Sequence, residues 1–358
     1  MISTTEQNGN ARRTASKSAP WPQGARVVDL CCGLGGLSLA AHQLGMSVVA
    51  GVDTNPTALK TFRCNFPGAE AIEASVRSKT VLRRCAQLLK PEKNDPYPGI
   101  VLSGPPCQGF SAAGSRNPKD RRNKLLVSVA LAIAELQPRC AVIENVSMVL
   151  AEKHGKRLTR FEEVLCDAKY HVQRVLLDAS EFGVSQKRRR AFFLITREKL
   201  NEQILMDRIN ASKIPAKGAK ETLHGLPVPE VRPDDYNDEK TYGSIFNHFA
   251  MLHSQAVKDK ISAIIPGTGP MSYRRLHPIR PSNTLFSGHR APPAHFSEPR
   301  SITVREAARL QGFPDEFRIY GSFANQMEQV TNAVPPPLTK AVLCVLAEMT
   351  DSLISSHG

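Results

Sequence analysis

The sequence has no run that approaches the roughly 18 consecutive apolar residues of a membrane span, so we expect no contact with a membrane. Its first 20 residues lack the apolar stretch of a secretory signal. Eight scattered cysteines are too few for a disulfide scaffold and fit the reducing cytoplasm. Because neither a C-x-x-C nor an H-x-x-x-H pair occurs, we expect no metal site.

Acidic residues are scarce beside basic ones: 33 Asp and Glu stand against 47 Lys and Arg, which gives a formal net charge of +14. An enzyme of small metabolites does not need this excess. A protein that contacts nucleic-acid phosphates does, because each neutralised phosphate releases counterions. The hydrophobic fraction of 41% is ordinary for a globular protein with a sizeable core. The composition therefore favours a nucleic-acid partner.

Short apolar runs alternate with helical periods over residues 26–199. We predict strands at 26–31, 47–52, 100–103, 141–144, 172–177 and 191–196, and helices at 36–44, 56–65, 79–89, 123–136 and 158–168. This alternation predicts an α/β fold with a doubly wound, Rossmann-like sheet.

The alternation stops near residue 199. Residues 200–300 are rich in Pro, Gly, His and Asn, and they are too many for a single loop inside one domain. Helical periodicity returns at 304–311 and 338–349. We predict a disordered basic tail at 1–20, a first domain at 21–198, a smaller irregular domain at 199–320 and a C-terminal return to the first domain at 321–358.

A glycine-rich turn, Asp29-Leu-Cys-Cys-Gly-Leu-Gly-Gly36, follows the first predicted strand. Its glycines let the backbone approach a ligand at the start of a helix. Asp53 ends the next strand, 20 residues after Gly33, where a carboxylate can accept hydrogen bonds from ribose hydroxyls. Ser38 stands where a dinucleotide fingerprint needs its third glycine. The turn favours a nucleoside cofactor without a pyrophosphate; a purely structural turn is the alternative.

A cysteine follows the predicted strand at 100–103. Pro105 and Pro106 stiffen the turn and fix the place of Cys107 at the carboxyl edge of the sheet, where α/β folds bind ligands. Only about 3% of an ordinary thiol is ionised at neutral pH, so a nucleophilic cysteine needs an environment that lowers its pKa. A buried structural cysteine is the alternative.

The segment from Ser111 to Lys124 is a basic loop with a net charge of +4. Its basic residues are Arg116, Lys119, Arg121, Arg122 and Lys124. A loop of this kind suits a lid that closes on a phosphate backbone, and an ordinary solvated loop is the alternative.

Charged residues flank two further predicted strands. Glu144 follows a buried apolar run, so desolvation would raise its pKa and let it hold a proton; a helix cap is the alternative. Gln186, Arg188 and Arg190 alternate before the last strand and project from one side of an extended segment. Arg190 is suited to planar recognition through several donors, although basic runs are usually solvated faces or nucleic-acid patches.

In this order, the segments resemble the bacterial DNA (cytosine-5) methyltransferases over residues 26–196 and about 275–345. The motifs are DLCCGLGG at 29–36, PPCQGFS at 105–111, ENV at 144–146, Q-x-R-x-R at 186–190, RSITVREAARLQGFPD at 300–315 and NAVPPP at 332–337. Six ordered motifs make the resemblance highly specific. It implies that the first domain is catalytic and binds S-adenosyl-L-methionine, and that 199–320 is a target-recognition domain.

The resemblance also implies a mechanism, in which a cytosine is flipped out of duplex DNA at a short specific site. Cys107 would attack C6, and Glu144 would bind N3 and the amino group. Arg190 would hold O2 and orient Glu144. The resemblance gives Asn145 and Gln186 structural roles, and it places Arg188 against the backbone or the loop.

The cofactor residues that the resemblance implies are Asp29, Leu30, Cys31, Gly33, Leu34, Gly35, Gly36, Asp53, Thr54, Ser75, Val76, Gly104, Pro106, Leu125, Asn332 and Ala333. The implied DNA contacts are Ser111, Arg116, Lys119, Arg121 and Arg122. Two positions depart from the family. Cys31 replaces an aromatic residue that stacks on the adenine, and 74–75 lacks an acidic residue, although Glu73 is close. Both departures imply an altered adenine pocket or weaker cofactor binding.

Two alternatives share this resemblance. One branch of the family methylates tRNA with the same catalytic residues, and a silent paralogue would only bind DNA. Intact Cys107, Glu144 and Arg190 oppose the silent paralogue, and Ser38 opposes a nicotinamide oxidoreductase. We expect a monomer that works at the nucleoid in the cytoplasm, with a restriction endonuclease as functional partner.

Overall fold

The computed structural model describes residues 21, 24–90, 99–106, 124–231, 245–270, 273–286 and 292–355. Several predicted features lie outside the described residues: the tail at 1–20, and Cys107, Ser111, Arg116, Lys119, Arg121 and Arg122.

A seven-stranded sheet in the order β3-β2-β1-β4-β5-β7-β6 organises the first part of the chain. Its strands are β1 (Arg26–Leu30), β2 (Ser47–Asp53), β3 (Glu70–Glu73), β4 (Ile100–Ser103), β5 (Cys140–Val146), β6 (His171–Asp178) and β7 (Arg189–Thr196). The strands β1 to β5 pair in parallel, and β7 is antiparallel to both of its neighbours. The chain reverses its direction of winding between β1 and β4, and this reversal is the point where α/β sheets bind ligands.

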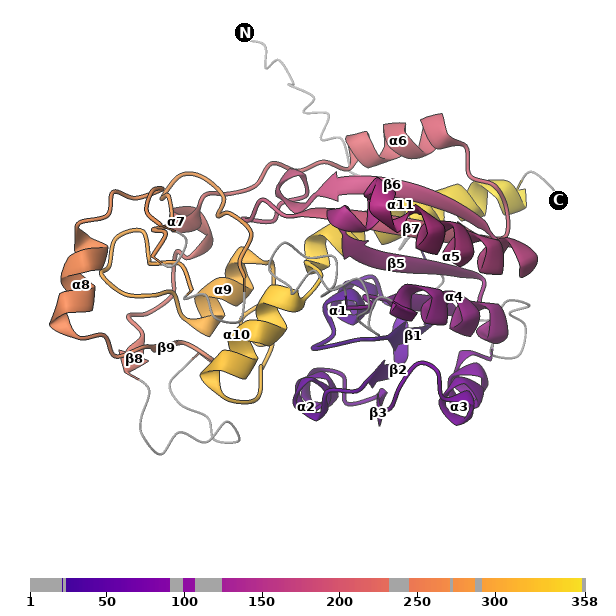
Figure 1. Ribbon diagram of the computed structural model, residues 1–358, viewed down its shortest axis with the longest axis horizontal. Coiled ribbons are helices and arrows are strands. Elements are labelled where there is room, and N and C mark those ends of the chain that lie inside the picture. The colour runs from indigo at the N-terminus through magenta and orange to yellow at the C-terminus, as the bar shows by residue number, and fades with distance from the viewer. Residues whose placement is uncertain are drawn as a thin grey trace, which may run out of the picture.

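Helices cover both faces of this sheet (Figure 1). One face carries α3 (Lys79–Leu89), α4 (Leu125–Leu136) and α5 (Gly155–Asp167), and the other carries α1 (Gly36–Gln43), α2 (Pro56–Asn65), α6 (Glu202–Ala211) and α11 (Pro336–Ser355). Neighbouring residues of β4 enter different cores, Val101 on the α4 side and Leu102 on the α1 side. The predicted doubly wound, Rossmann-like α/β fold is confirmed.

The remaining elements lie beside this layered part in Figure 1. They are α7 (Ala219–Thr222), β8 (Glu230–Val231), β9 (Phe249–Ala250), α8 (Gln255–Ser262), α9 (Val304–Leu310) and α10 (Phe323–Asn332). A buried arginine joins the irregular segments between these elements. Arg305 donates to the carbonyls of Phe246, Pro314 and Phe317 at 2.9, 2.7 and 2.5 Å. Backbone carbonyls of a region poor in regular structure thus find partners in one side chain.

Helix α6 follows the predicted domain boundary at 199 but packs against α11, where Arg208 pairs with Glu348. The predicted domain boundaries stay predictions.

One described stretch, Phe323–Thr350, has the length and mean hydropathy of a membrane span by composition alone. However, 67% of its most apolar window is buried inside the protein. The last helix, α11, packs against α1 and α6, and a helix buried on most sides is apolar for that reason.

Candidate active site

Four motifs that are distant in sequence converge at the carboxyl edge of the sheet, near the switch between β1 and β4. A Cβ atom built on Gly36 would lie 2.3 Å from the carbonyl oxygen of Val334. A Cβ on Gly104 would lie 3.6 Å from a methyl group of Val334 and 3.9 Å from Oε2 of Glu144. The first glycine turn, the end of β4, the end of β5 and the turn before α11 therefore meet at one place.

The glycine turn is fastened by Asp53 at the end of β2. One carboxylate oxygen accepts from the backbone N–H of Gly33 at 2.9 Å, and the other accepts from that of Asn55 at 2.9 Å. Gly35 has a φ of +99°, and a Cβ there would lie 2.4 Å from the ring of Phe66. The tight turn thus requires glycine at position 35 for both its conformation and its packing.

A second carboxyl group, Asp29, lies beneath the turn and is 0% exposed. The hydroxyl of Ser38 donates to its Oδ2 at 2.7 Å, while Oδ1 has no hydrogen-bond partner in the described part of the chain. Burial raises the pKa of Asp29 to about 7, with a smaller contribution from the charge of Asp53. Ser38, which stands where a dinucleotide fingerprint has its third glycine, is therefore the hydrogen-bond donor to the Asp29 carboxyl group.

The other predicted cofactor residues follow the ends of neighbouring strands. Ala74 donates its N–H to the carbonyl of Asp53 at 2.9 Å, which joins the segment after β3 to the turn. Cys31 is half-buried with a φ of +62°, and burial raises the pKa of its thiol. Thr54 follows β2, Ser75 and Val76 follow β3, Gly104 and Pro106 follow β4, Leu125 opens α4, Asn332 and Ala333 precede α11, and Leu30, Leu34 and Gly36 are buried within the first motif.

A buried ion pair lies at the end of β5. The Nε atom of Arg190 is 2.7 Å from Oε1 of Glu144, and both side chains are about nine-tenths buried. The antiparallel pairing places Glu144 opposite Phe192 and Arg190 opposite Val146, so the pair consists of diagonal neighbours on one face. Burial raises the pKa of Glu144, and the charges of Arg190 and Arg188 oppose that shift.

Three more residues of these motifs hold the surrounding backbone. Arg188 is 2% exposed and donates to the carbonyl of Ala333 at 3.0 Å. Asn145 donates to the carbonyl of Pro105 at 3.4 Å, which ties β5 to the segment leading to Cys107. Gln186 is fully buried and its amide contacts Gln311 at 2.8 Å.

The sequence profile of the C-5 cytosine-specific DNA methylases matches residues 25–348, which is most of the chain. The chain belongs to this family. It is a methyltransferase of cytosine C5 in DNA, and the resemblance found in the sequence is confirmed.

Relatives of this methylase include bacterial Type II methyltransferases. It is 31% identical to the Type II methyltransferase M.XorII of Xanthomonas oryzae pv. oryzae, over 88% of this chain and 82% of the relative. It is 29% identical to the Type II methyltransferase M1.HphI of Haemophilus parahaemolyticus, over 90% and 86%. Among solved structures, it superposes with a TM-score of 0.75 on a protein described as a DNA modification methyltransferase encoded within an E. coli prophage, at 25% identity, over 91% of this chain and 99% of that one. The Dnmt2 methyltransferase of S. pombe shares the fold, with a TM-score of 0.63, 18% identity and coverage of 90% and 98%.

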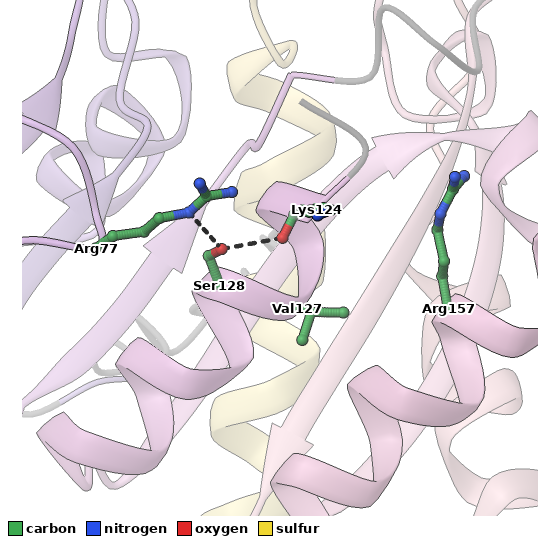
Figure 2. A pocket seen from close by; sticks show the side chains of 5 residues that line it. All are labelled: Arg77, Lys124, Val127, Ser128 and Arg157. Atoms are coloured by element: carbon green, nitrogen blue, oxygen red, sulfur yellow. Dashed lines mark hydrogen bonds between the residues drawn. The ribbon is translucent and has the colours of Figure 1, made fainter. Parts of the chain in front are cut away.

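The structure of the methylase adds a basic hollow that the sequence analysis did not single out (Figure 2). Its described lining residues are Arg77, Lys124, Val127, Ser128 and Arg157, and none of these five is acidic. The Nε atom of Arg77 donates to Ser128 at 2.9 Å, and Ser128 donates to the carbonyl of Lys124 at 3.0 Å. Of the predicted basic loop, Lys124 is the residue that falls within the described ranges.

The sequence also gave no role to Gln311, whose side chain is 0% exposed. It lies at the end of α9 within the motif RSITVREAARLQGFPD. The sequence did contain a signal for it: a glutamine directly follows the apolar residues of a short predicted helix, and a polar side chain buried there needs a hydrogen-bond partner.

Proposed function

We propose that this methylase transfers a methyl group from S-adenosyl-L-methionine to C5 of a flipped-out cytosine in a short specific duplex site. The observation that carries the proposal is the buried Glu144–Arg190 pair beside Gly104, three residues before Cys107. A carboxyl group and a guanidinium held together in this way present a hydrogen-bonding pattern that suits the N3, amino and O2 edge of cytosine.

The chemistry explains the division of roles. Cytosine C5 is a poor nucleophile until a thiolate adds to C6, and that addition places charge on the ring at N3. We propose that Cys107 forms the bond to C6 and that Glu144, with its raised pKa, stabilises the charge at N3. After C5 takes the methyl group, C5 loses its proton and the S–C6 bond breaks, which restores both the thiolate and the aromatic ring.

The turn between β1 and α1 fits the cofactor. When bound, S-adenosyl-L-methionine supplies an electrophilic methyl group on its sulfonium. A Cβ built on Gly33 would meet no atom of the described residues within 4 Å, so this part of the chain leaves space beside the turn. Asp53 presents a carboxylate beside that space, and we propose that it accepts hydrogen bonds from the ribose hydroxyls. We propose that the other cofactor residues predicted from the sequence line the same site.

Duplex DNA is the proposed partner. The net charge of +14 and the basic hollow at the start of α4 support contacts with backbone phosphates. We propose that Ser111, Arg116, Lys119, Arg121 and Arg122 contribute further contacts, as the sequence predicts. We further propose a monomer that acts at the nucleoid in the cytoplasm. Since the relatives carry Type II names, a restriction endonuclease would be its functional partner.

The proposal is tested by transfer of a tritiated methyl group to duplex DNA, to tRNA and to no substrate. We expect label in duplex DNA and none in the other two reactions. Cys107→Ser should abolish transfer while DNA binding persists, because an alcohol supplies far less anion near neutral pH than a thiol. Label in tRNA would show that tRNA, and not duplex DNA, is the substrate. Turnover of Cys107→Ser within about tenfold of wild type would show that Cys107 is not the nucleophile.

A further inference from the structure

Two buried glutamines connect the region between α9 and α10 to the candidate active site. Gln186 precedes β7, and Gln311 ends α9, 125 residues later. Both side chains are 0% exposed, and Nε2 of Gln186 donates to Oε1 of Gln311 at 2.8 Å. A buried amide pair of this kind keeps its geometry, because breaking it would leave two polar groups without partners.

The other end of the Gln311 amide holds the turn before α11. Its Nε2 donates to the carbonyl of Val330 and, at 3.3 Å, to that of Ala333. The carbonyl of Ala333 also accepts from Nη2 of Arg188 at 3.0 Å. One backbone oxygen is therefore shared between Gln311 and an arginine of the Q-x-R-x-R motif.

The other end of the Gln186 amide contacts the same arginine. Its Oε1 accepts from Nη1 of Arg188 at 3.5 Å and from the backbone N–H of Leu285 at 3.1 Å. Leu285 lies in the segment that the sequence assigns to target recognition. Contacts from two parts of that region thus converge on Arg188 through the glutamine pair.

Arg188 depends on these neutral acceptors for its position. No carboxylate lies within ion-pair distance of it among the described residues, and its Nε has no hydrogen-bond partner there. Its charge nevertheless acts on Glu144, as does that of Arg190. A displacement of Arg188 would therefore change the electrostatic field at the Glu144–Arg190 pair without breaking the pair itself.

We propose that Gln311 is a positioning residue for methyl transfer: through Gln186 and the carbonyl of Ala333, it fixes Arg188 beside the Glu144–Arg190 pair. It touches no substrate, and it couples the recognition region to the catalytic pair. The inference rests on the proposed function, because it requires that Glu144 and Arg190 bind the cytosine.

The test compares Gln311→Ala with Gln329→Ala as a matched control. Gln329 is also a buried glutamine, and it donates to the carbonyl of Tyr320 at 2.7 Å, away from Arg188. We expect Gln311→Ala to lower kcat about tenfold, which corresponds to the loss of roughly one buried hydrogen bond, with KM for S-adenosyl-L-methionine nearly unchanged. Gln329→Ala should retain kcat within about twofold.

The pH dependence of kcat separates positioning from general destabilisation. Arg188 and Arg190 oppose the upward shift in the pKa of Glu144, so a displaced Arg188 should move the titration of Glu144, and with it the kcat profile, to higher pH. Gln329→Ala should leave the profile in place. The double variant Gln186→Ala with Gln311→Ala should lower kcat by less than the product of the two single losses, since both glutamines act on the position of Arg188.

Three results would overturn the inference: an unchanged kcat in folded Gln311→Ala, a loss of kcat with an unmoved pH profile, or additive losses in the double variant. If Gln311→Ala does not fold, Gln311→Glu replaces it, because that side chain keeps the volume and the acceptor and lacks the paired donors. Wild-type protein that labels tRNA rather than DNA would refute the proposed substrate, and the same comparison would then be made on tRNA.

Discussion

Asp29 and Glu144 are both buried carboxyl groups, but their surroundings differ. Arg190 and Arg188 oppose the effect of burial on the pKa of Glu144, whereas Asp29 has a hydroxyl donor, Ser38, and feels the like charge of Asp53. Glu144 is therefore held beside two cations at the end of β5. Asp29 favours its neutral form beneath the glycine turn.

The raised pKa of Asp29 predicts a pH-dependent stability. In the unfolded chain Asp29 ionises near pH 4, and in the folded protein near pH 7, so between these values the folded state holds one more proton. Its contribution to stability is fully present below about pH 4 and declines as the pH rises to about 7. Asp29→Asn, which cannot ionise, should lack this decline. Melting temperatures of both proteins at pH 5 to 8 measure it. A constant difference between the two proteins across that range would contradict the prediction.

At the scale of elements, α1 approaches the turn before α11 so closely that only glycine fits between them. Gly36 opens α1, and a Cβ at this position would lie 2.3 Å from the backbone oxygen of Val334. We expect Gly36→Ala to lower the melting temperature and to weaken S-adenosyl-L-methionine binding, because backbone of the turn must move. Gly155, the first residue of α5, is the matched control, since a Cβ there meets no atom within 4 Å in the part of the chain that the structure describes. Calorimetry measures the melting temperature and the cofactor affinity of both alanine variants. Equal values for the two variants would show that the turn before α11 can move to make room for the added methyl group.

Elements with sharp local boundaries could be predicted from the sequence. The helix α2 starts at Pro56 after the cap Asn55, and its predicted bounds are those observed. The strand β3 was missed because it is a short strand at the edge of the sheet, with three half-buried residues and one exposed residue. The helices α6, α8 and α10 were missed because the capping residues Asn201, Ser254 and Ser322 lie in segments whose composition favours loops.

The candidate site was predictable where its chemistry lies in local motifs. Strand ends place Asp53 and Glu144 at one edge of the sheet, and the α/β pattern alone predicts that edge. Arg190 lies at the start of β7 and reaches the same edge because β7 runs antiparallel to β5, which the pattern does not predict. The pairing of Gln186 with Gln311 was not predictable, since no local period joins residues 125 positions apart. The basic hollow was missed for the same reason, because its residues come from the segment before α3, from the start of α4 and from α5.

At the scale of the whole molecule, the excess positive charge should act on DNA through particular surfaces. The hollow of Arg77, Lys124 and Arg157 lies where the predicted basic loop joins α4, and Figure 2 shows Arg77 and Arg157 on opposite sides of it. Phosphate contacts contribute affinity and a salt dependence but carry no base sequence. The hollow should therefore strengthen binding to every duplex by a similar factor.

Arg77→Gln tests this expectation, with Arg63→Gln as control. Both arginines are exposed and both changes remove one positive charge, but Arg63 lies on α2, outside the hollow. We expect Arg77→Gln to lower affinity for methylatable and unrelated duplexes about equally. It should also reduce the slope of log affinity against log salt by about one unit, because one fewer phosphate is neutralised. Arg63→Gln should leave the slope near that of wild type. Equal slopes for the two variants would mean that the net charge attracts DNA without a contact in the hollow. A loss confined to the methylatable duplex would instead assign Arg77 to sequence recognition.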